Sequence, residues 1–186
     1  DDFRGGSMEL GVTPGSGLQT FPTYLATNHD QTYRPQFHFT SRMNWLNDPN
    51  GLCYHDGQYH LFFQHNPMGN DWGNMSWGHA ISKDMVHWKQ IEHALLPYDG
   101  ATIFSGTGFV DHNDSLMPPD QDGKKKLVLC YTKAKRPFGQ CIAYSTDRGR
   151  TFQQVNDGNP VVPNHSFDPG ERDPKVFWHD GVSVVD

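Results

Sequence analysis

The sequence predicts an all-β fold, and three observations support this expectation. The chain contains 19 Gly, 13 Pro and 13% aromatic residues, a composition typical of short strands joined by many turns. Apolar and polar residues alternate over short stretches, and no stretch keeps the 3.6-residue period of an amphipathic helix. Turn-forming pairs such as Asp56-Gly57 separate these stretches and favour tight hairpins.

The expected strands follow one another from residue 51 onward, and the first two form a hairpin around Asp56-Gly57. Lys83–Val86 is predicted to make one helical turn at most. The run Ser183–Asp186 resembles the middle of a strand. Residues 1–30 are rich in Gly, Ser, Thr and Pro without a period, so we interpret them as a flexible leader. The predicted strands are Gly51–His55, Gln58–Gln64, Met75–Ser82, His87–Ile91, Thr102–Asp111, Lys126–Lys133, Gln140–Thr146, Phe152–Val155 and Lys175–His179.

An internal repeat organises these strands into larger units. Ala80–Asp84 followed by Trp88 parallels Ala143–Asp147 followed by Phe152, at an offset of 63 residues. A repeat of this length is typical of architectures in which one supersecondary unit recurs along the chain. The repeat therefore predicts that each unit is a small sheet of its own.

Three polar residues, Asp48, Ser105 and Asp173, each stand where the first strand of such a unit begins, 57 and 68 residues apart. This spacing is typical of a β-propeller, whose four-stranded blades surround a central channel. Because the first strand of each blade lines the axis, the three side chains should converge at one mouth of the channel. We predict that residues 31–186 form two blades and the start of a third.

Composition argues against several classes of protein. The formal net charge of −6 gives no basic stripe for nucleic acid, and no apolar run approaches the roughly 20 residues of a membrane span. The 11 His and 3 Cys show no zinc-ligand spacing, so we predict no metal. We interpret Cys53, Cys130 and Cys141 as free thiols, although a bridge between the last two is conceivable.

Several motifs occur in a fixed order from about Tyr33 to the end of the chain. They are Trp45–Gly51, Phe63–Pro67, Trp72-Gly73, Met75–Ala80, Phe104–Gly106 and Arg172–Val176. Together they resemble glycoside hydrolase family 32, which comprises invertases, inulinases and levanases. The sequence departs from the usual family pattern at Leu46, Thr107 and Glu171, and none of these changes removes a reacting group.

The resemblance implies a five-bladed β-propeller that cleaves β-fructofuranosidic bonds in sucrose, inulin or levan through a fructosyl-enzyme intermediate. Glycoside hydrolysis of this type needs no cofactor. Asp48 matches the family's nucleophile. Asp173 matches the carboxylate that stabilises the transition state by binding fructose hydroxyls. The positions that match the fructose subsite are Asn47, Gln64, Trp72, Phe104, Ser105 and Arg172.

The family's acid/base is a glutamate that the resemblance places beyond Asp186. Glu9 lies in the leader, Glu92 in an outer strand and Glu171 on a loop, so none is a convincing substitute. We therefore interpret the chain as the N-terminal portion of a longer enzyme and expect it to be inactive alone. Its partner would be a fructose-containing oligo- or polysaccharide; polymeric substrates favour a secreted or periplasmic protein, whereas sucrose can also be cleaved in the cytoplasm.

The residue types also fit this chemistry by themselves. A retaining glycosidase needs a carboxylate nucleophile beside an oxocarbenium-like transition state. Asp48 stands in a turn flanked by Pro and Gly, where Asn47 could donate hydrogen bonds that keep it ionised. Arg172 offers a fork of donors for sugar hydroxyls. Trp72 and Trp77 offer flat faces to a sugar, with core packing as the other use, and the commoner one for Trp77.

Other propeller proteins share some of these features. Ser145–Phe152 fits the S-x-D-x-G-x-T-[WF] Asp-box of sialidase-type propellers, but that motif is a hairpin-turn device. Sialidases also need three arginines, and only Arg172 has a clear position at the channel mouth. Fructan-transferring and arabinan-cleaving propellers have the same architecture. A non-catalytic fructan-binding propeller is the alternative from a different class, because the acid/base lies outside the sequence.

Overall fold

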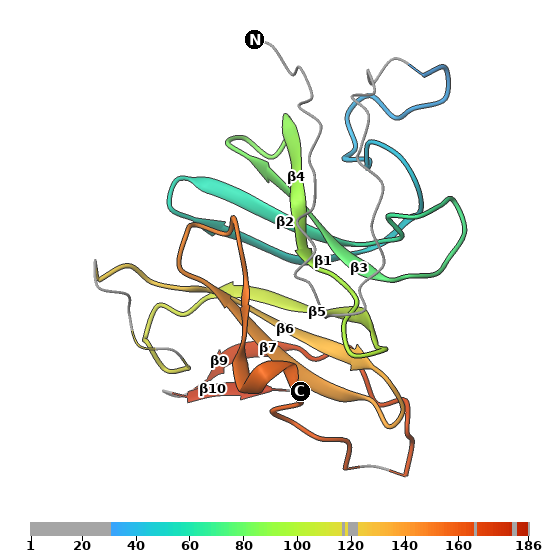
Figure 1. Cartoon of the computed structure of the whole chain (residues 1–186). Helices are drawn as coiled ribbons and strands as arrows, with labels where there is room; N and C mark the ends of the chain where they lie inside the picture. The colour runs from blue at the N-terminus through green and yellow to red at the C-terminus, as the bar shows by residue number, and fades with distance from the viewer. Residues whose placement is uncertain (1–30, 117, 119–122, 166, 180–181, 186) are drawn as a thin grey trace, which may run out of the picture.

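The computed structural model describes residues 31–116, 118, 123–165, 167–179 and 182–185, and the leader predicted for residues 1–30 lies outside them. Two four-stranded antiparallel sheets and one two-stranded hairpin make up this part of the chain (Figure 1). No helix in the described residues is long and apolar enough to cross a membrane. The strands are β1 Leu46–His55, β2 Gln58–His65, β3 Ser76–Ser82, β4 Trp88–Leu95, β5 Thr102–Val110, β6 Leu127–Ala134, β7 Gly139–Ser145, β8 Gln153–Gln154, β9 Val176–His179 and β10 Val182–Val185.

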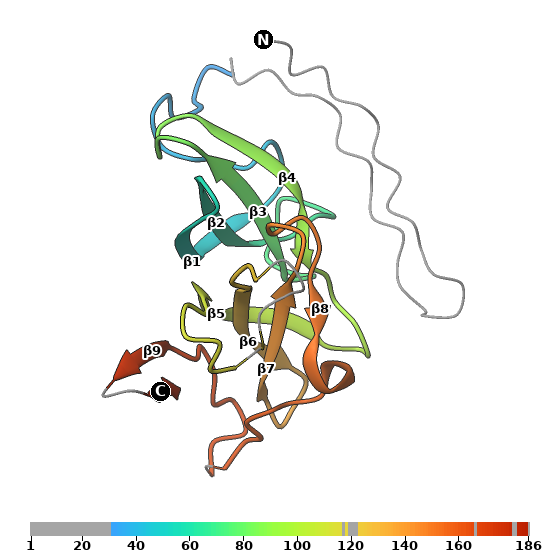
Figure 2. The same ribbon diagram turned by 90° about the vertical axis from the view of Figure 1, so that its left-hand side faces the viewer.

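The all-β prediction is confirmed, and so is the repeat. The strands follow in the order β1-β2-β3-β4 in one sheet and β5-β6-β7-β8 in the next (Figure 2), and β9 pairs with β10. The segments that repeat at an offset of 63 residues are the third strands of the two sheets, β3 and β7. This is the arrangement expected for two propeller blades and the start of a third, while the total of five blades stays a prediction.

Several local features differ from the prediction. Strand β1 begins at Leu46 and not at Gly51, so Asp48 lies in a strand instead of the turn expected from its Pro and Gly neighbours. Lys83–Val86 forms bends instead of a helical turn, because the Ser82 hydroxyl and the Asp84 carboxylate accept the nearby backbone N–H groups. The strand predicted for Phe152–Val155 shrinks to Gln153–Gln154 and is followed by a 3₁₀ turn, η1, at Val155–Gly158. Asn156 and Asp157 end the strand there, since both adopt positive φ values of 54° and 53°.

The Asp-box forms the hairpin turn that its pattern predicts. The Ser145 hydroxyl donates to Asp147 Oδ1 at 2.8 Å and accepts the backbone N–H of Gly149 at 2.8 Å. The other carboxylate oxygen of Asp147 accepts the hydroxyl of Thr151 at 2.6 Å. The polar side chains of the motif are thus bonded within their own turn, which gives it a structural role.

A mixed core joins the two sheets. Phe62 and Trp77 from the first sheet pack with Leu129 and Tyr131 from the second in one buried cluster. The Trp77 indole N–H donates to the carbonyl oxygen of Phe104 at 3.1 Å. Trp77 is fully buried, so of its two predicted uses the structure selects the core.

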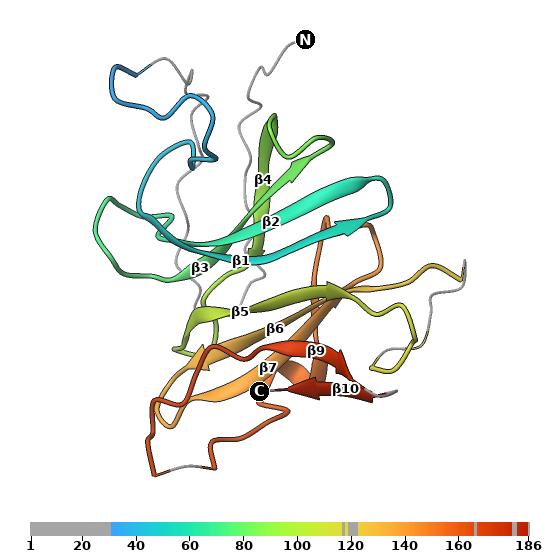
Figure 3. The same ribbon diagram turned by 180° about the vertical axis from the view of Figure 1, so that it is seen from behind.

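Strands β1 and β5 approach each other closely at the centre of the molecule (Figure 3). A Cβ built on Gly51 would lie 2.6 Å from the backbone nitrogen of Gly108, and one built on Gly108 would lie 3.1 Å from Gly51 Cα. At Gly51 only glycine permits this contact, because a Cβ there would overlap the backbone of β5, while a Cβ at Gly108 would be unusually close to β1. The two glycines therefore set the distance between the first strands of neighbouring blades.

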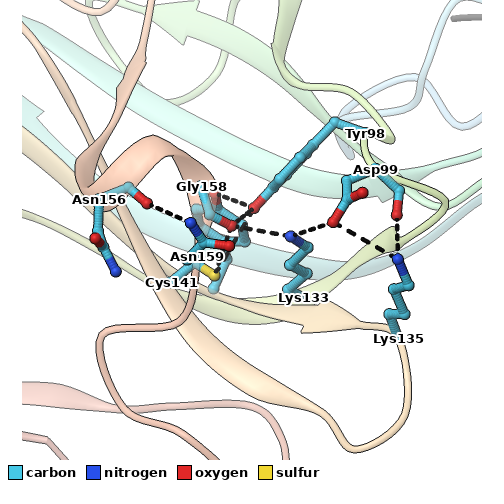
Figure 4. A network of polar contacts seen from close by, with 9 residues as sticks. Tyr98, Asp99, Lys133, Lys135, Cys141, Asn156, Gly158 and Asn159 are labelled. Carbon is cyan, nitrogen blue, oxygen red and sulfur yellow. Dashed lines mark hydrogen bonds and ion pairs between the residues drawn. The ribbon is translucent and has the colours of Figure 1, made fainter. Parts of the chain in front are cut away.

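A polar network ties the connection between the two sheets to η1 (Figure 4). The Tyr98 hydroxyl donates to the carbonyl oxygen of Gly158 at 2.7 Å, and Lys133 Nζ donates to the same oxygen at 3.2 Å. Lys133 Nζ also lies 3.0 Å from Asp99 Oδ2 and 4.7 Å from the centroid of the Tyr98 ring. These contacts satisfy a nearly buried ammonium group, which would otherwise destabilise the fold.

All three cysteines are free thiols, as predicted. Cys130 and Cys141 do not face each other across the β6–β7 hairpin, because Cys130 pairs with Ile142 and Cys141 with Tyr131. Burial raises the pKa of the Cys53 and Cys130 thiols to about 12. Both are therefore protonated and unreactive near neutral pH.

The first sheet buries a pair of histidines that the sequence analysis did not single out. His60 Nδ1 lies 3.0 Å from His79 Nε2, and the two rings pack against Phe62 and Phe152. The outward nitrogens, His60 Nε2 and His79 Nδ1, are buried without a hydrogen-bond partner in the described part of the chain. Burial lowers the pKa of His60 to about 4 and also lowers that of His79.

Acid is therefore expected to destabilise the protein below neutral pH. The pKa of His60 is about 4 in the folded state and lies below its ordinary value of 6.5, so the unfolded chain binds the proton first. The contribution of neutral His60 to the free energy of unfolding is fully present above pH 6.5. It falls by about 3 kcal/mol as the pH decreases to about 4. Denaturant unfolding at pH 7 and pH 4.5 measures this loss. His60→Gln should reduce the dependence on pH, whereas replacing the exposed His38 by Gln should not.

Candidate active site

The predicted site residues come together where the first strands of the sheets begin. Asp48 is the third residue of β1, Ser105 lies near the start of β5, and Asp173 stands three residues before β9. The Ser105 hydroxyl donates to Asp48 Oδ2 at 2.7 Å, and the charge of Asp48 is close enough to raise the pKa of Asp173. The convergence predicted from the repeat spacing is thus present.

The Asp48 carboxylate is positioned by the neighbouring blade. Its hydrogen-bond donor in the structure is Ser105 on β5, and not the Asn47 amide considered from the sequence. The Asn47 side chain is held instead by Trp45, whose indole N–H donates to Asn47 Oδ1 at 2.7 Å. This bond uses one lone pair of the oxygen, so the Asn47 amide keeps its NH₂ group and one further acceptor position for a ligand.

Asp173 is held by contacts with the second blade. Its backbone N–H donates to Thr132 Oγ1 at 2.9 Å, and the next carbonyl, that of Pro174, accepts the Thr107 hydroxyl at 2.8 Å. The residue adopts a left-handed backbone with a φ of 67°, a conformation that aspartate tolerates better than most residues. Such a conformation persists only where the surroundings fix it, so β5 and β6 determine where this carboxylate stands.

Opposing effects act on the pKa of the Asp173 carboxyl group. Partial burial is the main cause that raises the pKa of its carboxyl group, and the nearby Asp48 raises it further. Arg172 lowers it, with Nε 3.7 Å from Asp173 Oδ2. Two carboxylates and one guanidinium therefore share this end of the sheets, which favours a ligand rich in hydroxyl groups or one that develops positive charge.

Aromatic and amide groups border the carboxylates. Trp72, in the loop between β2 and β3, is 59% exposed and meets the Phe104 ring edge-on at a centroid distance of 6.0 Å. Gln64, at the end of β2, is 2% exposed, and its Nε2 has no hydrogen-bond partner among the described residues. An open indole face and an amide with an unsatisfied N–H group are each suited to a sugar, which has both apolar faces and hydroxyl groups.

Two supporting residues were missed by the sequence analysis. Asn50 is buried, and its Oδ1 accepts the backbone N–H of Gly106 at 3.3 Å, which links β1 to β5 beside Ser105. Thr132 supports Asp173 from β6 and also donates to Gln140 Oε1 at 2.7 Å. Asn50 could have been noticed because it adjoins Asp48-Pro49, but nothing in the sequence distinguishes Thr132 from other strand threonines.

The glutamates of the described residues take no part in this arrangement. Glu92 is exposed on β4, the edge strand farthest from β1 in its sheet. Glu171 is exposed on the loop before Asp173, and its Oε2 accepts the backbone N–H of His165 at 3.2 Å. Glu9, the third candidate, lies outside the described residues.

A family model and the sequences of known proteins match most of this chain. Residues 38–184 match the model of the glycosyl hydrolases family 32 N-terminal domain. The chain is 50% identical over 157 residues to a levanase of Bacillus subtilis (strain 168), covering 82% of this chain and 22% of the levanase. It is 46% identical over 180 residues to an extracellular exo-inulinase of Aspergillus awamori, covering 83% of this chain and 33% of that protein.

Solved structures agree with the sequence comparison. The crystal structure of exo-inulinase from Aspergillus awamori superposes with a TM-score of 0.73 at 42% identity, covering 83% of this chain and 34% of that one. A β-fructofuranosidase from Schwanniomyces occidentalis complexed with fructosyl-erythritol superposes with a TM-score of 0.74 at 39% identity, covering 86% and 33%. The chain thus spans about a third or less of these relatives.

Proposed function

Because the chain belongs to glycosyl hydrolase family 32, we propose that it is the N-terminal part of the catalytic propeller of a retaining β-fructofuranosidase. The observation that carries this proposal is the hydrogen bond from Ser105 on β5 to Asp48 on β1, together with the contacts of Thr107 and Thr132 that hold the Asp173 segment against the same second blade. In this assignment residues 31–186 belong to the catalytic domain and residues 1–30 precede it as a leader.

Asp48 acts as the nucleophile in this proposal. Its carboxylate attacks the anomeric carbon of fructose, the glycosidic bond breaks, and a fructosyl ester forms on Asp48. Ser105 holds the attacking carboxylate in place through the 2.7 Å hydrogen bond.

Asp173 and Arg172 bind the sugar ring as charge develops. Asp173 accepts hydrogen bonds from fructose hydroxyls, and its negative charge stabilises the oxocarbenium-like transition state. Arg172, 3.7 Å from that carboxylate, donates to a hydroxyl and keeps Asp173 oriented. Asn47, Gln64, Trp72 and Phe104 enclose the same ring. The proton for the leaving oxygen comes from a glutamate outside these 186 residues.

The names of the relatives include levanase and exo-inulinase, and they favour fructans as the substrates of this protein. The test is an assay of the full-length protein with sucrose, inulin, levan and a sialoside. We expect fructose release from the first three substrates and none from the sialoside, with initial retention of anomeric configuration observed by NMR. Binding of fructan without turnover would instead establish the non-catalytic alternative.

A further inference from the structure

An aromatic row continues outward from the proposed fructose subsite. Trp72 meets Phe104 at a centroid distance of 6.0 Å, and Phe104 meets Phe138 edge-on at 5.5 Å. Phe138 lies at the end of the hairpin between β6 and β7, and it is buried. The row therefore connects Trp72 of the proposed fructose subsite to a hairpin that the subsite does not use.

Arg136 lies on the outer end of this row. Its guanidinium carbon stands 5.3 Å from the centroid of the Phe138 ring, a cation–π distance. The hairpin itself is fixed, because the Phe138 backbone N–H donates to the carbonyl oxygen of Pro169 at 2.9 Å. Arg136 is exposed, so its N–H groups have a supported position and remain open to a ligand.

Gly170 brings Arg136 close to the residues of the site. A Cβ built on Gly170 would lie 3.6 Å from Arg172 Nη1 and 3.8 Å from Arg136 Nη2, and Arg172 Nη1 donates to the Gly170 carbonyl at 3.2 Å. Arg172 in turn contacts Asp173. The two guanidinium groups thus flank one glycine, with Arg172 on the side of the catalytic carboxylates and Arg136 beyond it.

The charges around Gly170 favour a neutral ligand. Asp168 Oδ1 accepts the Gly170 N–H at 2.8 Å and would lie 3.2 Å from the same Cβ. A carboxylate at this point opposes an anionic group such as a phosphate. Sugar hydroxyls both donate and accept hydrogen bonds, so they suit a place that offers guanidinium N–H groups beside a carboxylate oxygen.

We propose that Arg136, supported by Phe138, binds hydroxyl groups of the sugar unit attached to the fructose that is cleaved. This inference rests on the proposed function, and it makes Arg136 a specificity-determining residue of the leaving-group side. It contacts the second sugar and takes no part in bond breaking. Its contribution is therefore confined to substrates that have a second sugar.

The test compares substrates with and without that second sugar in the full-length enzyme. In Arg136→Ala, kcat/KM for sucrose and for 1-kestose should fall about tenfold, the loss expected for hydrogen bonds from a charged donor. The value for methyl β-D-fructofuranoside, which has no second sugar, should stay within about twofold of the wild type. Arg136→Lys should restore little of the loss, since an ammonium group lacks the planar fork.

Lys135→Ala is the matched control. It removes one positive charge from the adjacent position, but Lys135 Nζ is directed to Asp99, 2.9 Å from the carbonyl oxygen and 3.6 Å from Oδ2 (Figure 4). Its kinetics with sucrose should match the wild type.

Three results would overturn the assignment of Arg136. They are an equal loss with sucrose and methyl fructoside, no loss with either, and a larger loss with sucrose 6-phosphate than with sucrose, which would mean recognition of charge. A wild-type enzyme that hydrolyses no fructoside would instead refute the proposed function, so the two failures are distinguishable.

Discussion

Replacing Asp48 by alanine in the full-length protein is expected to abolish fructoside hydrolysis, with kcat reduced by about 10⁴-fold or more. Loss of the nucleophile removes the covalent pathway and leaves only binding and polarisation by the remaining groups. Steady-state release of fructose from sucrose and inulin measures the effect. Asp173→Ala should reduce kcat to a similar extent, because it removes the negative charge beside the developing oxocarbenium ion.

Controls must separate chemistry from folding. Asp48 is exposed at the end of the sheets and accepts a hydrogen bond from Ser105, so Asp48→Asn keeps the size of the side chain and an acceptor for that hydroxyl. We expect its unfolding midpoint to remain close to that of the wild type while turnover is lost. Activity of Asp48→Asn or Asp48→Ala above a hundredth of the wild type would exclude Asp48 as the nucleophile.

Replacing Gly51 by alanine is expected to destabilise the fold by about 3 kcal/mol or more, a loss typical of overpacking combined with backbone strain. The new Cβ would lie 2.6 Å and 2.7 Å from backbone atoms of Gly108, and the residue has a φ of +52°. Since backbone atoms cannot rotate away, β1 and β5 must separate. That movement would also lengthen the contact between Ser105 and Asp48.

Gly57→Ala provides the comparison for backbone strain alone. Gly57 also has a positive φ, of +84°, but a Cβ there would meet nothing within 4 Å. Denaturant unfolding should therefore show a loss of about 1 kcal/mol for Gly57→Ala and a much larger one for Gly51→Ala. Equal losses for the two variants would show that the approach of β1 to β5 contributes nothing beyond the backbone conformation.

Much of the fold could be predicted from the sequence, because its signals are local. The Asp56-Gly57 turn and the Asp-box at Ser145–Phe152 specify hairpins through backbone geometry and hydrogen bonds within a few residues. The strand prediction at Phe152–Val155 was too long, because the alternating pattern of the sequence does not show where the backbone turns. The left-handed Asn156 and Asp157 ended a strand that its alternating pattern had extended.

Part of the candidate site could be predicted because the repeat is visible in the sequence. Equivalent positions in a repeat must converge when the units stack around one axis, so the spacing of Asp48, Ser105 and Asp173 anticipated their meeting. The supporting contacts were not predictable. Thr132 and Asp173 are 41 residues apart in the chain, and neither residue carries a local sign of the other.

By itself, the sequence determined the strands, the turns, the repeat and the residue types that a fructoside-cleaving site requires. Only the tertiary structure decided that Ser105, and not Asn47, donates to Asp48, that Trp77 belongs to the core, and that Arg136 lies beside Gly170. The physical reason is the range of each interaction. Turn chemistry acts between near neighbours, whereas hydrogen-bond partners and packing depend on how separate blades approach one another.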